Sequence, residues 1–188
     1  MTRSVCVFCG SAPGVRPSYS AAARELGEAL AKHHMTLVYG GGRLGLMGIV
    51  ADAALNAGGR VIGVIPRMLI ERELAHPNLT RQHVVSTMHE RKTLMAEMSD
   101  GFVGLPGGMG TFDELVEIVT WAQLGLHAKP VVLANIERYF DPLYAMLDYA
   151  VAEGFVTVES RGRWRNADSV ASVMGILTKE GLAGEGIP

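Results

Sequence analysis

A strong turn signal stands at residues 106–114, which read Pro106-Gly107-Gly108-Met109-Gly110-Thr111-Phe112-Asp113-Glu114. The apolar residues 102–105 before it are typical of a buried strand, and the apolar spacing after it predicts a helix over residues 111–125. A glycine-rich turn between a strand and a helix exposes backbone N–H groups at the positive helix end, where a phosphate binds well. Because anion binding alone gains little from a carboxylate, Glu114 indicates chemistry on a phosphorylated ligand.

Strand-like and helix-like segments alternate along the whole chain. We predict strands at residues 4–9, 36–39, 61–65, 83–85, 101–105 and 131–134. We predict helices from Pro17, after the glycine loop at residues 40–45, and over residues 87–98, 111–125, 141–152 and 168–179, with Asp141 as an N-cap. This alternation indicates an α/β fold with a mainly parallel sheet. We expect one domain over residues 1–182 and a flexible tail at residues 183–188.

Composition narrows the class of protein. The chain has 188 residues, of which 48% are hydrophobic, and a net charge of -2, which suits one compact domain. It has no basic run that suggests nucleic acid, and no apolar run reaches the roughly 18 residues that span a bilayer. The start also lacks a signal-peptide cleavage pattern. We therefore expect a cytoplasmic protein with no nucleic-acid or membrane partner.

The two cysteines, Cys6 and Cys9, are spaced as C-x-x-C within a β-branched and aromatic run. Residues three apart on a strand point to opposite faces, whereas a redox pair belongs at a helix start. The sequence has no second cysteine pair to complete a metal site. Both cysteines are therefore predicted to be buried structural residues, and we expect no metal and no cofactor.

Three loops are predicted at the carboxyl ends of strands, where open α/β sheets bind ligands. They are residues 9–12, which include Ser11, residues 40–45 and residues 106–111. The middle loop matches G-x-G-x-x-G, but the following strand ends without the acidic residue that a dinucleotide site needs, and neither glycine loop carries a P-loop lysine. The three loops together suit a nucleotide-sized ligand. Tight packing of helix on strand is the alternative explanation of the glycines.

The helix predicted over residues 87–98 starts with a capping box, Thr87 to Glu90. Arg91 and Lys92 follow, although cations oppose the helix dipole at this end. They either face a bound anion or carboxylate, or lie on a solvated helix face, and the spacing leaves both readings open. Glu114 and Glu117 share one face of their helix, where they act in chemistry or lie at the surface; we favour Glu114 because it is closer to the glycine turn.

Taken together, these segments resemble the Lonely Guy (LOG) family of cytokinin riboside 5'-monophosphate phosphoribohydrolases. The motif P-G-G-x-G-T-x-x-E at residues 106–114 carries the resemblance, with residues 88–92 and 40–48, and the likeness covers about residues 4–152. It implies a Rossmann-like three-layer αβα sandwich and a homodimer. It also implies hydrolysis of the N-glycosidic bond of N6-substituted AMP, and of AMP, to a free base and ribose 5-phosphate. Arg91 and Glu114 are the implied catalytic pair.

We predict that the 5'-phosphate binds to Gly107, Gly108, Gly110 and Thr111. The remaining residues predicted to bind substrate are Ser11, Gly41, Gly42, Met88, Lys92 and Glu117. Rival functions are a general nucleoside 5'-monophosphate nucleosidase in salvage, a non-catalytic nucleotide-binding protein and, less favoured, an NAD oxidoreductase. A lysine decarboxylase, a common label for such sequences, needs a Schiff-base lysine, and only Lys92 is a candidate. Trp121, Leu124 and Leu126 are predicted either in a dimer contact or in the core.

Overall fold

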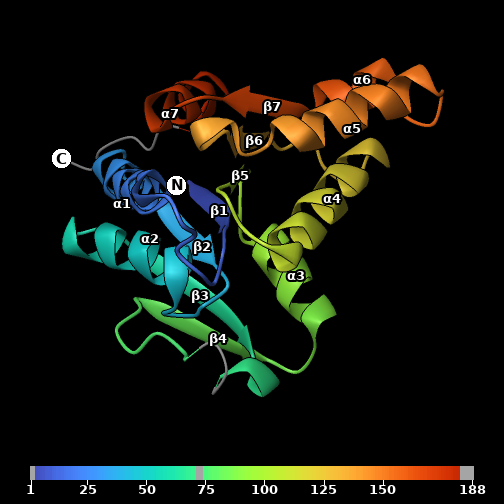
Figure 1. The fold of residues 1–188 in the computed structure, drawn as a ribbon. Coiled ribbons are helices and arrows are strands. Elements are labelled where there is room, and N and C mark those ends of the chain that lie inside the picture. Colours follow the sequence, from blue (N-terminus) through green and yellow to red (C-terminus); the bar gives the residue numbers. More distant parts are fainter. Residues whose placement is uncertain (1–2, 71–73, 183–188) are drawn as a thin grey trace.

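The computed structural model describes residues 3–70 and 74–182 of the chain (Figure 1). Its centre is a sheet of seven parallel strands in the order β4-β3-β2-β1-β5-β6-β7. The strands are β1 (Ser4–Phe8), β2 (Thr36–Tyr39), β3 (Val61–Pro66), β4 (Arg81–Val85), β5 (Gly101–Gly104), β6 (Val131–Ala134) and β7 (Trp164–Ala167). The register places Val5 of β1 beside Leu37 of β2 and Gly101 of β5.

Helices cover both faces of the sheet. The helices are α1 (Pro17–Lys32), α2 (Gly45–Asn56), α3 (Met88–Glu97), α4 (Met109–Gln123), α5 (Asp141–Ala152), α6 (Val158–Gly162) and α7 (Val170–Lys179), with short 3-10 turns η1 (Arg67–Leu69) and η2 (Ile136–Arg138). One core joins the sheet to α1, α2 and α7, and the other joins it to α3, α4 and α5. The predicted three-layer αβα sandwich is confirmed. The predicted tail at residues 183–188 lies outside the described residues.

The central strand β1 shows how the sequence builds both cores. Val5 and Val7 lie in the core under α1 and α2, while Cys6 and Phe8 lie in the core under α3 and α4. Cys9, just after the strand, belongs to the first core, so the two cysteines lie on opposite faces, and both are buried and free. Strands covered on both faces bury almost every side chain, which explains their continuous apolar runs. The prediction that both cysteines are buried on opposite faces of the sheet is confirmed.

Near the end of the chain, the sequence predictions missed two elements and placed one helix cap wrongly. Residues 158–167 were not predicted as elements, yet they form α6 and β7, and Trp164 is buried in the sheet. The strand escaped prediction because it is a four-residue edge strand in which Arg165 and Asn166 interrupt any apolar pattern. Asp141 is not the N-cap of α5, which is Phe140; its carboxylate accepts a hydrogen bond from Asn135 Nδ2 at 2.8 Å instead.

The direction in which the chain adds strands to the sheet changes between β1 and β5, which are hydrogen-bonded neighbours. The chain builds the sheet outward from β1 to β4 and then returns to the other side of β1 with β5. The loops after β1 and β5 therefore lead away in opposite directions, and such a switch point is where open α/β sheets bind ligands. Gly10 N donates to Pro106 O at 3.1 Å, which holds these two loops side by side.

Candidate active site

Two adjoining pockets open at the carboxyl ends of β1 and β5. We call the first the carboxylate pocket: it has a volume of about 160 Å³ and is lined by Cys9, Gly10, Ser11, Met47, Arg91, Gly108, Met109, Gly110, Thr111 and Glu114. We call the second the tyrosine pocket: it has a volume of about 200 Å³, and Tyr19, Tyr139, Pro13 and Leu46 are among its walls. Gly10, Ser11 and Gly108 line both pockets. Six of the predicted site residues, from the loop after β1, from α3 and from the first turns of α4, thus meet in the carboxylate pocket.

The glycine turn before α4 leaves its backbone open to a ligand. Gly108 is the N-cap of α4 and makes no side-chain cap, and the first N–H groups of a helix have no partner within the helix. A Cβ atom built on Gly108 or Gly110 would meet no atom within 4 Å. A Cβ on Gly107 would lie 2.1 Å from Thr111 Oγ1. Gly107 is therefore needed for packing, whereas Gly108 and Gly110 keep space beside the helix end.

This difference predicts opposite outcomes for two neighbouring substitutions. Gly108→Ala is expected to change the free energy of unfolding by less than about 1 kcal/mol, because its Cβ meets no other atom. It is expected to weaken ribose 5-phosphate binding by about tenfold or more, because the methyl group occupies the open space where the sequence predicts that the phosphate binds. Gly107→Ala is the matched control and is expected to destabilise the fold by about 1–3 kcal/mol. Thermal unfolding and titration calorimetry of both variants measure the two effects, and a Gly108→Ala protein with unchanged affinity contradicts this role.

Arg91 is a buried guanidinium on α3. Its side chain is 4% exposed, Nε donates to Val64 O at 3.1 Å and Nη2 donates to Gly40 O at 2.9 Å. A Cβ on Gly40 would lie 2.1 Å from Nη2, so a larger residue at this position would displace the guanidinium group. Arg91 therefore does not lie on a solvated helix face, which was one of the two alternatives that the sequence left open. Its side chain is enclosed by β3 and by the first glycine loop.

Glu114 brings a carboxylate into the same pocket from the second turn of α4. The residue is partly buried and lines the pocket beside Gly110 and Thr111. Burial and then the charge of Glu114 raise the pKa of the Cys9 thiol, while the charge of Arg91 lowers it. All three groups line the pocket, and the raised pKa leaves Cys9 as a neutral thiol. An acidic and a basic side chain thus converge on one small cavity next to the open helix end.

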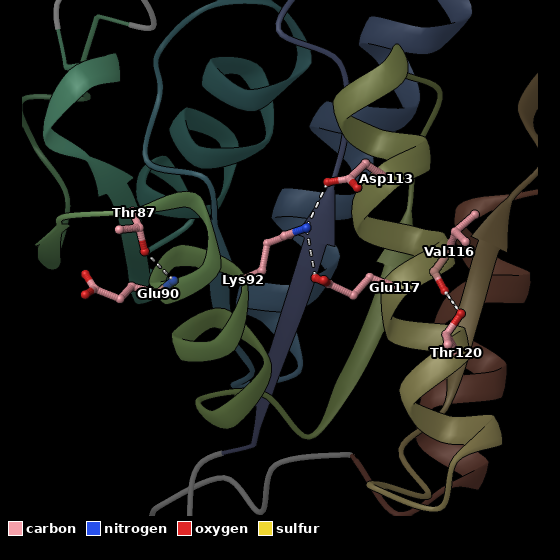
Figure 2. A network of polar contacts seen from close by, with 7 residues as sticks. All are labelled: Thr87, Glu90, Lys92, Asp113, Val116, Glu117 and Thr120. Carbon is pink, nitrogen blue, oxygen red and sulfur yellow. Dashed lines mark hydrogen bonds and ion pairs between the residues drawn. The ribbon is translucent and has the colours of Figure 1, made fainter.

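Lys92 and Glu117 form a bridge between α3 and α4. Figure 2 shows Lys92 reaching across to α4, where its Nζ lies 3.0 Å from Asp113 Oδ2 and 3.1 Å from Glu117 Oε2. Partial burial lowers the pKa of Lys92, but hydrogen bonds to the two carboxylates outweigh it and leave the pKa above its usual value. Neither Lys92 nor Glu117 lines the described pockets. Their predicted contact with substrate stays a prediction.

The start of α3 confirms the predicted cap. Thr87 Oγ1 accepts a hydrogen bond from Glu90 N at 3.1 Å (Figure 2), and Glu90 Oε2 accepts one from Ser86 N at 2.7 Å. Glu90 is thus a capping residue. Met88, the first residue of α3, is partly exposed and lies outside the two pockets, so its predicted substrate contact stays a prediction.

The glycines of the first glycine loop, residues 40–45, pack closely against neighbouring segments of the protein. Gly41 has φ +79, and its Cα lies 2.8 Å from the Cβ position of Gly63. Gly41 O accepts a hydrogen bond from His76 N at 2.9 Å, and Gly42 forms a bridge with Ala75. Gly45 has φ +57, and a Cβ there would lie 2.3 Å from the carbonyl carbon of Ser11. The packing explanation accounts for these glycines. Gly41 and Gly42 line neither pocket, and their predicted contact with the ribose-phosphate end stays a prediction.

Sequence reasoning missed the tyrosine pocket. Tyr139 follows η2, and its hydroxyl donates a hydrogen bond to Gly107 O in the glycine turn. Tyr19 of α1 meets Tyr139 edge-on, with ring centroids 5.8 Å apart. Neither tyrosine belongs to a motif, and the left-handed backbone at Glu137 and Arg138 that precedes Tyr139 has no glycine to signal it. No pattern in the sequence could have placed these rings at the site.

The fold and the site together define an α/β protein of the Rossmann-like class whose carboxylate pocket joins a glycine-lined helix end to an acidic and a basic side chain. A family model described as "Possible lysine decarboxylase" matches residues 47–177. A probable cytokinin riboside 5'-monophosphate phosphoribohydrolase of Oryza sativa subsp. japonica is 52% identical over 172 residues, which are 92% of this chain and 76% of that protein. The chain belongs to the LOG family, as its motifs indicated.

Other relatives agree with this assignment. The cytokinin riboside 5'-monophosphate phosphoribohydrolase of Rhodococcoides fascians is 50% identical, over 86% of this chain and 82% of its own. The enzyme of the same description from Arabidopsis thaliana is 49% identical, over 85% of this chain and 75% of its own. The solved structure of a molybdenum cofactor carrier protein from Chlamydomonas reinhardtii has a TM-score of 0.72 and 22% identity, and the match covers 95% of this chain and 97% of that one. At this identity it supports the fold alone.

Proposed function

We propose that this chain hydrolyses the N-glycosidic bond of cytokinin riboside 5'-monophosphates, which are N6-substituted forms of AMP, and that it also accepts AMP. The products are the free base and ribose 5-phosphate. The observation that carries the proposal is the carboxylate pocket, because it holds Arg91 and Glu114 beside the open helix end at Gly108–Thr111. The relatives described above carry the same activity in their names.

The pocket suggests how substrate lies. The 5'-phosphate binds to the backbone N–H groups of Gly108 and Gly110 and to the hydroxyl group of Thr111, where the helix dipole favours an anion. Glu114 stands about one turn further along α4, so the ribose extends from the phosphate toward its carboxylate. Ser11 lines the pocket from the loop after β1 and supports the ribose-phosphate end. Binding the remote phosphate positions the glycosidic bond, so the unphosphorylated riboside reacts poorly.

The chemistry needs a negative group beside the sugar. As the C1'–N bond breaks, the base leaves with the bonding electrons and positive charge develops on the ribose, as in other glycoside hydrolyses. Glu114 stabilises this charge and orients the attacking water, whose oxygen bonds to C1' and whose proton passes to the departing base nitrogen through solvent or the carboxylate. Arg91 stays protonated and therefore cannot act as a base. Its positive charge keeps the Glu114 carboxylate ionised and helps to orient the substrate in the pocket.

The charge state of Lys92 weighs against lysine decarboxylation. A pyridoxal-phosphate enzyme needs a lysine amine that forms a Schiff base with the cofactor. Lys92 is held as an ammonium group between Asp113 and Glu117, and its raised pKa opposes loss of the proton. Its side chain bridges two helices and lines neither pocket. The description attached to the family model therefore fits this site less well than hydrolysis does.

Base release from a panel of substrates tests the proposal. Purified protein is incubated with isopentenyladenosine 5'-monophosphate, its riboside, AMP and a pyrimidine 5'-monophosphate, and the free base is measured by chromatography. We expect release from the modified monophosphate first and from AMP second, and little from the riboside. Equal turnover of purine and pyrimidine monophosphates supports the salvage nucleosidase instead. Tight nucleotide binding without base release supports a non-catalytic binding protein and contradicts the proposal.

We also propose that the chain works as a homodimer in the cytoplasm and that residues 1–182 form one domain. Exposed apolar side chains occur on α5, which carries Met146 and Tyr149, and in the segments that follow α4 and α5, which carry Leu124, Leu126 and Phe155. Trp121 packs partly into the core, so only Leu124 and Leu126 of the predicted contact are open. We expect a second copy of the chain to cover these side chains. A mass of one chain in light scattering would contradict this dimer.

Within residues 3–70 and 74–182, no helix is apolar over a bilayer-spanning length, and no cluster of three metal-ligating side chains occurs.

A further inference from the structure

Tyr139 holds one end of the peptide that joins Gly107 to Gly108. Its hydroxyl donates a hydrogen bond to Gly107 O, and Tyr139 lines the tyrosine pocket together with Gly107. Gly108 lines both pockets, and Gly107 does not line the carboxylate pocket. The carbonyl oxygen of this peptide is therefore anchored on the side of the tyrosine pocket.

Because the peptide group is planar, fixing its carbonyl group also fixes the direction of the N–H group of Gly108. In a trans peptide the C=O of one residue and the N–H of the next point in opposite directions, and the described residues contain no cis bond. With its carbonyl held by Tyr139, the Gly107–Gly108 peptide directs the Gly108 N–H away from the tyrosine pocket and toward the carboxylate pocket. That N–H is the first of the donors at the start of α4 that have no partner within the helix.

A peptide between two glycines has little intrinsic preference for one orientation. Glycine reaches φ values that other residues avoid, so this peptide can rotate at small energetic cost. In the rotated state a carbonyl oxygen replaces an N–H group at the helix end and repels a phosphate. The hydroxyl of Tyr139 is the group that opposes this rotation.

The fold accepts backbone strain to place Tyr139. Glu137 and Arg138, the two residues before it, are both left-handed, with φ 54 and φ 59, although neither is a glycine. Arg16 Nη1 holds Glu137 Oε2 at 3.1 Å, and the ring of Tyr139 stacks on Phe112 of α4 with centroids 6.4 Å apart. Strained non-glycine residues persist where surrounding contacts enforce them and cluster at functional sites.

We propose that Tyr139 is a positioning residue that sets the affinity of the site for the 5'-phosphate by orienting the Gly108 N–H. The proposal rests on the proposed function for the identity of the substrate, but its physical content is the binding of a phosphate monoester. Tyr139 lines the tyrosine pocket and not the carboxylate pocket, where the reacting bond is proposed to lie. Its removal therefore affects phosphorylated ligands and leaves unphosphorylated ones unchanged.

The test compares Tyr139→Phe with Tyr144→Phe. Phenylalanine keeps the ring contacts of Tyr139 and removes only the hydroxyl. Tyr144, on α5, is a matched control because its buried hydroxyl has no hydrogen-bond partner among the residues that the structure describes. Titration calorimetry measures ribose 5-phosphate binding, and steady-state kinetics measure AMP and adenosine. For Tyr139→Phe we expect about tenfold weaker ribose 5-phosphate binding and an equal rise in KM for AMP, with kcat and adenosine turnover within about twofold. We expect Tyr144→Phe to match the wild-type protein.

Three outcomes overturn the proposal. One is a Tyr139→Phe protein that binds ribose 5-phosphate as the wild type does, and another is equal losses for AMP and adenosine. If the variant fails to fold, the amide resonance of Gly108 in the wild-type protein is followed by NMR during a ribose 5-phosphate titration, and the third overturning outcome is an amide that does not shift. Wild-type protein that binds ribose 5-phosphate but releases no base refutes the proposed function and leaves this test intact.

Discussion

Glu114→Gln is expected to lower kcat by about 10²- to 10⁴-fold, the range that a positioned acid–base group contributes. The amide keeps the shape of the side chain in the carboxylate pocket but removes the negative charge that stabilises the developing ribose cation. Binding of AMP is expected to stay within about threefold of wild type, because in the proposed binding mode the helix end, and not Glu114, holds the phosphate. Single-turnover base release and equilibrium binding of AMP measure the two quantities separately.

Asp113→Asn is the matched control for this prediction. Asp113 is the preceding residue on α4, but its carboxylate turns to Lys92 (Figure 2) and lines neither pocket. We expect the turnover of Asp113→Asn to stay close to wild type. A loss of turnover in Glu114→Gln alone would then show that catalysis needs the carboxylate in the pocket and not merely the total negative charge of α4. A Glu114→Gln protein with wild-type turnover would falsify the assigned role. Equal losses in the two variants would show that α4 is sensitive to any loss of charge.

Arg91→Met is expected to lower kcat/KM by about 10²- to 10³-fold, as removal of one preorganised electrostatic group does in other enzymes. It is also expected to destabilise the fold, because Val64 O and Gly40 O lose their buried donor, which costs about 1–3 kcal/mol for each unpaired group. Loss of the cation raises the pH at which activity falls on the acidic side, because a nearby positive charge favours an ionised carboxylate. The pH–rate profile and thermal unfolding measure these effects.

Arg161→Met is the control for Arg91→Met. Arg161 is a partly buried arginine that pairs with Asp148 and lies 4.6 Å from the ring centre of Tyr144, far along the chain from the pocket residues. Its loss is expected to change stability by no more than about 1 kcal/mol and to leave turnover unchanged. If Arg91→Met loses stability but keeps the wild-type kcat/KM and pH profile, Arg91 serves the fold alone and the catalytic pairing is wrong.

Local sequence signals predicted the parts of the site that lie within a few residues of one another. The glycine turn and Glu114 are separated by one helical turn, so their proximity follows from helix geometry alone. The cap at Thr87 and the opposite-facing cysteines follow from equally short periodicities. The alternation of strands and helices also predicted the layers, because parallel strands need crossover helices.

Contacts between distant segments could not be predicted in this way. Arg91 and Lys92 are neighbours in sequence with the same charge, yet one is enclosed by main-chain carbonyl groups 51 and 27 residues away and the other bridges two helices. Which face of α3 meets β3 decides their roles, and no local pattern contains that choice. The same holds for the first glycine loop, whose glycines serve packing against Arg91, Gly63 and the Ser11 loop.

The sequence by itself determined the α/β class, the glycine turn before the helix that follows residue 108, and the position of the acid one helical turn further on. These depend on backbone freedom at glycine and on helical periodicity, which act over a single turn. The tertiary structure alone decided that Arg91 enters the pocket, that Lys92 and Glu117 face each other, and that Tyr139 reaches Gly107 O from 32 residues away. These depend on which buried surfaces pack together, and packing is settled by the whole sheet rather than by any one segment.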